Sequence, residues 1–380
     1  MKRVCIISQN ASPGHLIFRK EFIRHLVVQG HEVYAFALDY TAESERAVED
    51  LGAIPVLFHL NKTGFNPFSD ILDTYKMYKA LRQLSPDVVF SSFVKPSIYG
   101  SIASGLAGVP RTVAMLEGLG YIHTPSKNGI PFKKRVLQLL FGALCSLGYA
   151  FADSVLFLNS DDLRDLSRLA FLNAGKLKVL GPIGLDLQAY PFSEPDLTKP
   201  IRFIFIARLL AEKGIFEFIA AARLVKKQFP KVDFVVLGGL DQDNPSALSK
   251  AELYEVLKED LVIYPGHVNN VSEWIADSHV FVLPSYREGI PRSTQEAMAI
   301  GRVVITTDVP GCRETVVDGA NGFIVPPWNV EALAEKMLYL IQHPEKIKRM
   351  GIESHRMAVE RFDAHKINPT LAGIVLGEDG

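Results

Sequence analysis

The chain has 380 residues, of which 48% are hydrophobic and 22% are charged, and its formal net charge at pH 7 is −1. This length exceeds what one hydrophobic core usually holds, so we expect two domains of about 190 residues each. The balanced charge excludes an overall affinity for polyanions, and we therefore expect no nucleic-acid partner.

Cysteine usage and the first residues indicate the compartment. Cys5, Cys145 and Cys312 lie far apart, with no CxxC motif or Cys/His cluster, which fits a reducing cytosol and predicts no zinc site. The opening residues MKRVCIISQN have a basic start but only a short apolar run. This pattern predicts a first strand rather than a signal peptide.

Apolar strands alternate with amphipathic helices through the first half of the chain. The strands are expected at 4–8, 32–38, 54–60, 87–91 and 111–115, and the helices at 16–28, 42–51, 69–84 and 97–106. This alternation predicts a parallel sheet with right-handed crossovers, hence an α/β, Rossmann-like domain. Its ligand crevice should lie at the carboxyl ends of the strands.

Three loops should border that crevice. The loop of residues 10–15 contains Gly14, where backbone could approach a ligand closely, and ends with His15. It is not GxGxxG, which argues against a dinucleotide site. The other two loops contain Lys95 and the sequence EGLG, which starts at Glu117; this carboxylate could instead cap a short turn. A lone loop histidine such as His15 or His123 is more often hydrogen-bonded than catalytic.

A basic cluster precedes an uncharged run. Lys133, Lys134 and Arg135 have no acid among them, and residues 136–152 carry no charge. The run is too short to span a membrane, which takes about 20 residues. A basic cluster before an apolar helix predicts contact with an anionic bilayer through these three cations. The alternative is a helix buried between the layers of the domain, with its basic flank in water.

A glycine-containing turn ends the first domain. The sequence VLGPIGLDLQAYPF, residues 179–192, includes Gly184, Asp186 and Tyr190 and is followed by a proline-containing stretch. We therefore expect a first domain at 1–183, a hinge at 184–200, a second domain at 201–360 and a tail at 361–380. Helices are expected at 330–341 and 344–361. We expect the last of these helices to cross back to the first domain, and the tail to return to that domain.

The second half restarts the strand and helix alternation. An apolar strand at 201–207 is followed by RLLAEKG and a helix at 216–227, which places Arg208 and Lys213 in one loop. The planar guanidinium of an arginine and the ammonium of a lysine can bind the same anion there. The alternative is that both side chains are simply solvated.

A carboxylate stands on each side of the turn in FVLPSYREGIPRSTQEAMAIG. A strand ends at Pro284 and a helix is expected at 292–300, so Glu288 lies in the loop and Glu296 on the helix. The helix start attracts a phosphate through free amides and the positive end of the helix dipole. Two carboxylates beside an anion site suit hydroxyl groups attached to that anion, as in a nucleotide sugar. The alternative is a surface helix with two solvated glutamates.

These motifs resemble the donor site of family 4 retaining glycosyltransferases, which have the GT-B fold of two Rossmann-like domains. The match lies in Glu288-x7-Glu296 and in the R-x4-K-G element that starts at Arg208. The resemblance implies that Glu288 faces the transferred sugar, that Glu296 holds the ribose, and that Arg208 and Lys213 grip the diphosphate. It implies three catalytic residues, Arg208, Lys213 and Glu288. It implies donor binding by Gly14, Gly239, His267, Val268, Gly289, Ile290, Pro291 and Glu296. It implies acceptor binding by His15, Lys95 and Glu117.

The sequence GFNPF at 64–68 and EGLG at 117–120 extend the resemblance. They are similar to bacterial transferases that add an N-acetylhexosamine, often GalNAc, to a sugar on undecaprenyl diphosphate in N-glycan or O-antigen assembly. The implied partners are a UDP-sugar donor, a polyprenyl-diphosphate-linked acceptor and an anionic membrane surface, at the cytoplasmic face of the cell membrane.

No metal or other cofactor is expected. The sequence Asp241-Gln242-Asp243 resembles the metal-binding DxD of another transferase class, which we interpret as coincidence because the GT-B class needs no metal to bridge the diphosphate. Two rival classes remain: a UDP-sugar 2-epimerase of the same architecture, and a sugar- or lipid-binding protein with a degenerate site. An epimerase would be expected to lack the Glu288 and Glu296 pair combined with Arg208 and Lys213.

Overall fold

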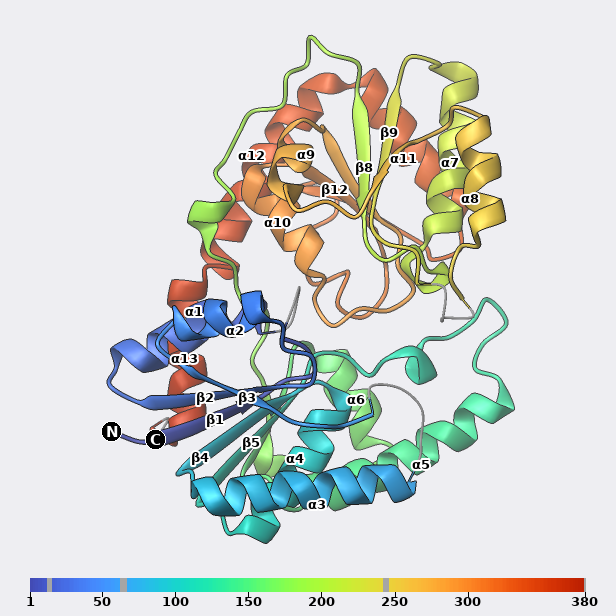
Figure 1. The fold of residues 1–380 in the computed structure, drawn as a ribbon. Helices are drawn as coiled ribbons and strands as arrows, with labels where there is room; N and C mark the ends of the chain where they lie inside the picture. Colours follow the sequence, from blue (N-terminus) through green and yellow to red (C-terminus); the bar gives the residue numbers. More distant parts are fainter. Residues whose placement is uncertain (12–15, 62–66, 242–245, 379–380) are drawn as a thin grey trace. The chain divides into compact units, whose positions relative to one another are not determined.

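The computed structural model describes residues 1–11, 16–61, 67–241 and 246–378. The chain divides into two compact units. The first unit comprises Met1–His123, Ile130–Gly184 and Ala364–Gly380, and the second comprises Thr124–Gly129 and Leu185–Asp363. Both are α/β units built on a parallel sheet (Figure 1).

Within the described residues, the first unit contains a seven-stranded parallel sheet in the order β3-β2-β1-β4-β5-β6-β7. Its strands are β1 (Arg3–Ile7), β2 (Glu32–Ala37), β3 (Ile54–Leu57), β4 (Val88–Ser92), β5 (Arg111–Leu116), β6 (Ser154–Phe157) and β7 (Leu177–Val179). Strand β1 pairs with β2 on one side and with β4 on the other, so the strand order reverses there.

Helices cover both faces of the first sheet (Figure 1). Helices α1 (Lys20–Val28) and α13 (Ala364–Leu376) pack together, and α13 contacts β4 and β5. On the other face, α4 (Val94–Ala107) lies between α3 (Pro67–Leu84) and α5 (Phe132–Tyr149). The remaining α-helices of this unit in the described residues are α2 (Ala42–Glu49) and α6 (Ser160–Ser167).

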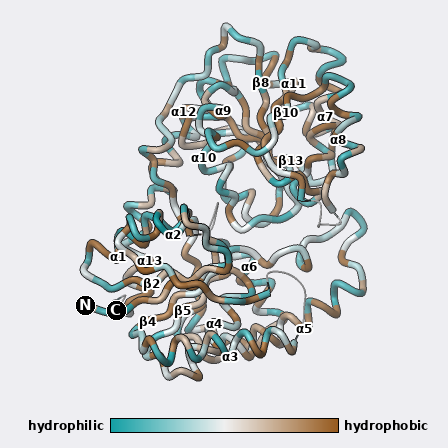
Figure 2. The backbone as a smooth tube through the Cα atoms, in the orientation of Figure 1, coloured by the Kyte–Doolittle hydropathy of each residue, from teal (hydrophilic) through white to brown (hydrophobic). Residues whose placement is uncertain are grey.

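The second unit repeats this plan with six parallel strands among its described residues, in the order β10-β9-β8-β11-β12-β13. Its strands are β8 (Arg202–Ile206), β9 (Asp233–Leu237), β10 (Ile263–Gly266), β11 (Val280–Leu283), β12 (Val303–Thr307) and β13 (Gly322–Val325). The reversal here lies between β8 and β11, which pair at Phe203 and Val280. The strands of both units are largely hydrophobic (Figure 2), as expected of sheets buried on both faces.

Two groups of helices flank the second sheet (Figure 1). On one side, α7 (Ile215–Gln228) packs against α11 (Val330–Gln342), with α8 (Lys250–Lys258) beside them. On the other, α10 (Arg292–Ile300) packs against α9 (Val271–Ala276) and α12 (Pro344–Arg361). The bounds of α10 and α12 are those predicted from the sequence.

The end of the chain differs from the prediction. We expected the helix at 344–361 to be the last and to cross back to the first domain, but α12 stays in the second unit. The additional helix α13 belongs to the first unit, where Lys2 Nζ donates to Leu376 O at 2.7 Å. This helix contains Pro369 in its interior, where proline removes a backbone donor. Strand β7 and helix α8 were not predicted either.

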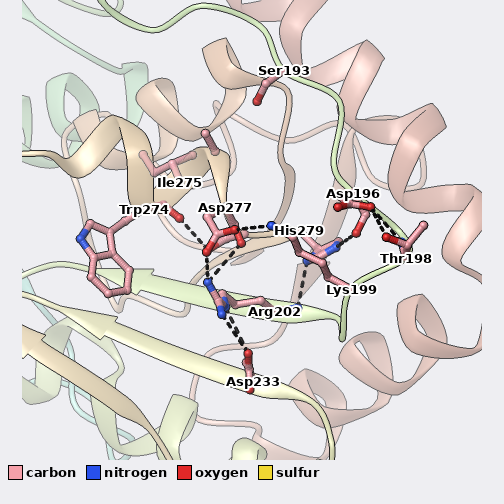
Figure 3. Close-up of polar contacts among 12 residues, drawn as sticks. Ser193, Asp196, Thr198, Lys199, Arg202, Asp233, Trp274, Ile275, Asp277 and His279 are labelled. Atoms are coloured by element: carbon pink, nitrogen blue, oxygen red, sulfur yellow. Dashed lines mark hydrogen bonds and ion pairs between the residues drawn. The ribbon is translucent and has the colours of Figure 1, made fainter.

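From Leu185 on, the hinge segment groups with the second unit, and polar contacts fasten it there (Figure 3). The buried Arg302 donates to Ser193 O at 2.6 Å and to Ser193 Oγ at 2.7 Å. Further along, His279 Nε2 lies 3.0 Å from Asp196 O, and Lys199 Nζ donates to Asp277 Oδ1 at 3.1 Å. These contacts hold residues 193–199 against the end of α9 and the starts of β11 and β12.

Candidate active site

The reversal between β8 and β11 places two predicted loops at one edge of the second sheet. Parallel strands present their carboxyl ends at the same edge, and ligands of open α/β sheets bind where the strand order reverses. Arg208 and Lys213 follow β8, and Glu288 follows β11. The sheet topology therefore places the proposed diphosphate and sugar residues in adjacent loops.

The backbones of these two loops are in contact. The amide of Tyr286 donates to Glu212 O at 2.9 Å. Gly214 has a φ of +78°, and a Cβ there would lie 2.2 Å from Pro284 O, closer than any side chain allows. The turn that carries Lys213 therefore depends on glycine both for its conformation and for its contact with the end of β11.

Lys213 and Glu288 form an ion pair. The Nζ atom of Lys213 lies 2.5 Å from Oε1 of Glu288, and Ser285 Oγ donates to the same oxygen at 2.8 Å. The two side chains are 21% and 12% exposed, so the pair is mostly shielded from water but remains accessible at the edge of the sheet. The structure thus brings together Lys213, predicted to bind the diphosphate, and Glu288, predicted to bind the sugar.

Arg208 lies apart from this pair. Its Nη1 atom pairs with Asp241 Oδ2 at 2.9 Å, and its side chain is 62% exposed. The backbone near it is closely packed, because Leu209 N donates to Gly239 O at 3.2 Å and a Cβ on Gly238 would meet Ala207 O. The structure therefore places Arg208 beside the loop after β9, with its guanidinium held by Asp241.

Glu296 lies on the second turn of α10 and is buried. Tyr190 Oη donates to its Oε1 at 2.8 Å, and Arg292 Nε donates to the same oxygen at 3.0 Å. Burial raises the pKa of this carboxyl, while the two donors act in the opposite direction. Sequence reasoning did not assign a site role to Tyr190 or Arg292; Arg292 was foreseeable, since it lies four residues before Glu296 on the same helix.

The remaining predicted donor residues lie in loops at the same edge. Gly289, Ile290 and Pro291 form the turn from β11 into α10, whose N-cap residue is Pro291. Gly239 follows β9, and the exposed His267 follows β10 together with Val268. Gly14 lies outside the described residues.

Two predicted acceptor residues of the first unit are engaged in ion pairs. Lys95 Nζ lies 2.8 Å from Asp70 Oδ1, and this aspartate also accepts from Tyr99 Oη at 3.0 Å. Glu117 Oε1 lies 2.5 Å from Nη2 of Arg19, whose side chain is only 2% exposed. Both lie close to the carboxyl ends of β4 and β5, the edge where the crevice was predicted.

Two loop histidines of the first unit were singled out in the sequence, His15 and His123. His15 lies outside the described residues. His123 is buried, and its Nδ1 lies 3.1 Å from Leu119 O.

Glu117 was alternatively interpreted as a turn cap. In the structure its carboxylate instead forms the ion pair with Arg19.

The basic cluster lies within α5 rather than before it, which corrects the predicted start of that helix. Lys133, Lys134 and Arg135 occupy its first turn, because the helix begins at Phe132. Lys134 Nζ donates to Tyr121 O at 3.1 Å and lies 3.7 Å from the centre of the Tyr121 ring. The expected alternative of a fully buried helix does not hold, since large apolar side chains are exposed along it. These are Phe132, Val136, Leu137, Leu139, Leu140 and Leu147.

The described helices and acidic, histidine and cysteine side chains bear on membrane and metal binding. Among the helices in the described residues, none combines the length and apolarity needed to cross a bilayer. Over the same residues, no group of three or more His, Cys, Asp or Glu side chains is arranged to hold a metal ion. Asp241, the first residue of the DxD-like sequence, pairs with Arg208, and the other two residues lie outside the described part.

Two family models together match most of the chain. The model for Glycosyltransferase Family 4 matches residues 19–188, and the model for Glycosyl transferases group 1 matches residues 188–357. The point where they meet lies in the predicted hinge.

Two curated relatives are named for lipid-linked acceptors. The chain is 29% identical to an N,N'-diacetylbacillosaminyl-diphospho-undecaprenol alpha-1,3-N-acetylgalactosaminyltransferase of Campylobacter jejuni, over 87% of each sequence. It is 26% identical to a UDP-Gal:alpha-D-GlcNAc-diphosphoundecaprenol alpha-1,3-galactosyltransferase of Escherichia coli, over 67% of this chain and 66% of the relative. The epimerase alternative is therefore not favoured.

Solved structures support the fold. HepE from Anabaena in complex with UDP-glucose superposes with a TM-score of 0.78 at 18% identity, covering 99% of this chain and all of that one. Sucrose-phosphate synthase from Thermosynechococcus elongatus superposes with a TM-score of 0.73 at 16% identity, covering 98% of each chain. Both confirm the predicted arrangement of two Rossmann-like domains, the GT-B fold.

Proposed function

Because this chain belongs to the family 4 glycosyltransferases and has the GT-B fold, we propose that it moves a sugar from a UDP-sugar to a saccharide on polyprenyl diphosphate. The observation that carries this proposal is the convergence of Lys213 and Glu288 at the strand-order reversal of the second sheet. A cation and a carboxylate in contact there suit a ligand that has a phosphate and hydroxyl groups side by side.

The chemistry follows from where charge develops. The bond between the anomeric carbon and the diphosphate oxygen breaks, and its electron pair stays on the diphosphate. Lys213, Arg208 and the amides at the start of α10 stabilise that negative charge, and removing one such preorganised donor costs about 3 to 4 kcal/mol in other enzymes. Glu288 hydrogen-bonds the sugar hydroxyls, and Glu296 accepts from the ribose.

The acceptor hydroxyl forms the new bond on the face that the diphosphate leaves. Its proton passes to the leaving phosphate oxygen, so the anomeric configuration is retained and no side chain need serve as a general base. We propose that no metal ion takes part, because Lys213, Arg208 and the helix start supply positive charge to the diphosphate.

The acceptor class is supported by the relatives of Campylobacter jejuni and Escherichia coli, both named for sugars on undecaprenyl diphosphate. The first relative is also named for N-acetylgalactosamine transfer, which favours an N-acetylhexosamine such as GalNAc as the donor sugar. Within the first unit, Lys95 and Glu117 are the described candidates for acceptor binding, because both lie near the carboxyl edge of the sheet.

A lipid-linked acceptor requires the enzyme to reach a bilayer. Helix α5 supports contact with an anionic surface at the cytoplasmic face of the membrane, because Lys133 and Arg135 in its first turn are exposed, as are Phe132, Leu139 and Leu140. Apolar side chains that enter the interface and cations near anionic headgroups both favour such binding.

A donor and acceptor panel tests the proposal. The full chain is incubated with UDP-GalNAc, UDP-GlcNAc, UDP-galactose or UDP-glucose, with and without an undecaprenyl-diphosphate-linked saccharide, and UDP release is measured. We expect release that depends on the acceptor, a product one sugar heavier by mass spectrometry, and no loss of rate in EDTA. Isomerisation of the UDP-sugar without acceptor would instead establish the epimerase.

A flotation experiment tests the membrane contact. The chain is mixed with vesicles of neutral lipid alone or with about one third anionic lipid, and the bound fraction is measured after centrifugation. We expect binding to the anionic vesicles, weakened when Leu139 and Leu140 are both replaced by serine. Equal binding of this variant and the parent would exclude α5 as the contact.

A further inference from the structure

The hinge segment supplies a polar group to the buried carboxylate of α10. Tyr190 follows the short helical turn Leu187–Ala189, and its hydroxyl lies 2.8 Å from Glu296 Oε1. The two residues are 106 positions apart in the sequence, but both belong to the second unit. The contact therefore links the hinge segment directly to Glu296, a residue predicted to bind the UDP-sugar.

The two donors to Glu296 use only one of its oxygens. Tyr190 Oη and Arg292 Nε both donate to Oε1, and in the described part of the chain no hydrogen bond is made to Oε2. Because two donors hold Oε1, the plane of the carboxylate is fixed. The position of Oε2 is therefore fixed as well. A fixed carboxylate oxygen is well suited to accept from hydroxyl groups of a ligand.

The two donors differ in what they can fix. Arg292 lies one turn before Glu296 on the same helix, and such i,i+4 pairs form on exposed helices with little dependence on the rest of the fold. Tyr190 approaches from outside the helix, and burial together with the Glu296 charge raises the pKa of its hydroxyl to about 12. At neutral pH it is thus protonated and can only donate its proton to the carboxylate.

We propose that Tyr190 is a positioning residue for ribose recognition: its hydroxyl orients the Glu296 carboxylate and keeps it available to the ribose hydroxyls of the UDP-sugar. The inference rests on the proposed function, because it takes a uridine nucleotide to be the ligand. It assigns to the hinge a part in donor binding that the donor motifs themselves do not contain.

The test compares Tyr190→Phe with the parent chain for two ligands, UDP and 2',3'-dideoxy-UDP, by isothermal titration calorimetry. The parent should bind UDP more tightly than the analogue. The variant should lose about tenfold in affinity for UDP, the scale of one hydrogen bond to a buried charge, and less than twofold for the analogue. In the transferase reaction, KM for the UDP-sugar should rise while kcat changes little.

Tyr34→Phe is the matched control. Tyr34 Oη also donates to a glutamate, Glu32 Oε1, at 2.8 Å. Both residues lie in the first half of β2, in the first unit. We expect this variant to bind both ligands as the parent does. Thermal denaturation of both variants checks that each is folded.

The remaining outcomes separate the inference from the proposed function. An equal loss for UDP and the dideoxy analogue, or no loss for either, would overturn the role of Tyr190 while leaving the transferase intact. Failure of the parent chain to distinguish the two ligands would remove ribose recognition by Glu296 and with it the inference. No UDP binding by the parent would overturn the proposed function itself.

Discussion

The Nζ atom of Lys213 lies 2.5 Å from Oε1 of Glu288, and this contact joins the loops after β8 and β11. Opposite charges in contact stabilise each other at the sheet edge, where a lone charge with so little exposure would be costly. A bound donor offers Lys213 a phosphate and Glu288 a sugar hydroxyl. Under the proposed function, the ion pair therefore holds both side chains near their binding positions before the donor arrives.

Replacement of Lys213 by alanine should lower kcat by roughly a hundredfold or more, because the leaving diphosphate loses a preorganised cation. Initial rates of UDP release at saturating donor measure this. Lys258→Ala is the control, since Lys258 pairs with Glu255 at 3.1 Å on the surface of α8. The control should retain full activity. A loss of less than threefold for Lys213→Ala would contradict the diphosphate assignment.

Replacement of Arg208 by alanine should raise KM for the UDP-sugar about tenfold, the scale of one charge-assisted hydrogen bond to the diphosphate. The melting temperature should not change, because Arg208 is exposed and, in the described part of the chain, pairs only with Asp241. Arg223, which pairs with Glu259 on the surface at 2.7 Å, provides the matched alanine control. If both variants have the parent's KM, Arg208 does not contact the donor.

The sequence signals of the proposed donor site are local. Pro291 and Gly301 mark both ends of α10, so the positions of Glu288 and Glu296 relative to the helix start could be inferred. The pairing of Lys213 with Glu288 required the additional step that β8 and β11 are neighbours.

Contacts between distant segments could not be predicted in this way. Tyr190 reaches Glu296 because the hinge follows a particular path along the second unit, which no residue pattern specifies. Arg19 is paired with Glu117 from 98 residues away. Helix α13 was missed because Pro369 within it is a local signal against helix, and packing against α1 outweighs it.

Replacement of Gly311 by alanine should both destabilise the fold and lower activity. Its φ is +78°, and a Cβ would lie 2.2 Å from Gly289 O and 2.4 Å from Glu288 O. Positive φ alone costs about 1 to 3 kcal/mol for a residue other than glycine. The added clash must displace the backbone of Glu288, so we expect kcat to fall at least tenfold. Denaturant unfolding and initial rates measure the two effects.

Gly319→Ala separates backbone strain from that displacement. Gly319 has a φ of +76°, but a Cβ there would meet nothing within 4 Å. This variant should lose stability to a similar backbone strain and keep its kcat. Equal kcat values for the two variants would show that the Gly311 contact does not position Glu288.

The buried His279 should make the second unit sensitive to acid. Its Nδ1 accepts the amide of Arg202 at 3.1 Å, so the neutral ring carries its proton on Nε2 and donates it to Asp196 O at 3.0 Å (Figure 3). Burial lowers the pKa of this ring most, and the charges of Arg302 and Arg202 lower it further. The hydrogen bond to Asp196 O and the Asp196 carboxylate act in the opposite direction. A second ring proton would also face the Arg202 amide.

The sign of the effect follows from this lowered pKa. The unfolded chain takes up a proton on His279 near pH 6.5, and the folded chain does so only at lower pH. Stability from the neutral ring is therefore fully present above about pH 6.5 and is lost as the pH falls through the folded pKa.

Asparagine at this position keeps an acceptor for the Arg202 amide but cannot titrate. We expect His279→Asn to be less stable than the parent at pH 7.5 and the difference to shrink on acidification, measured by thermal denaturation, whereas the exposed His59→Asn should follow the parent at every pH. Parallel curves for the parent and His279→Asn would show that the neutral ring does not set this dependence.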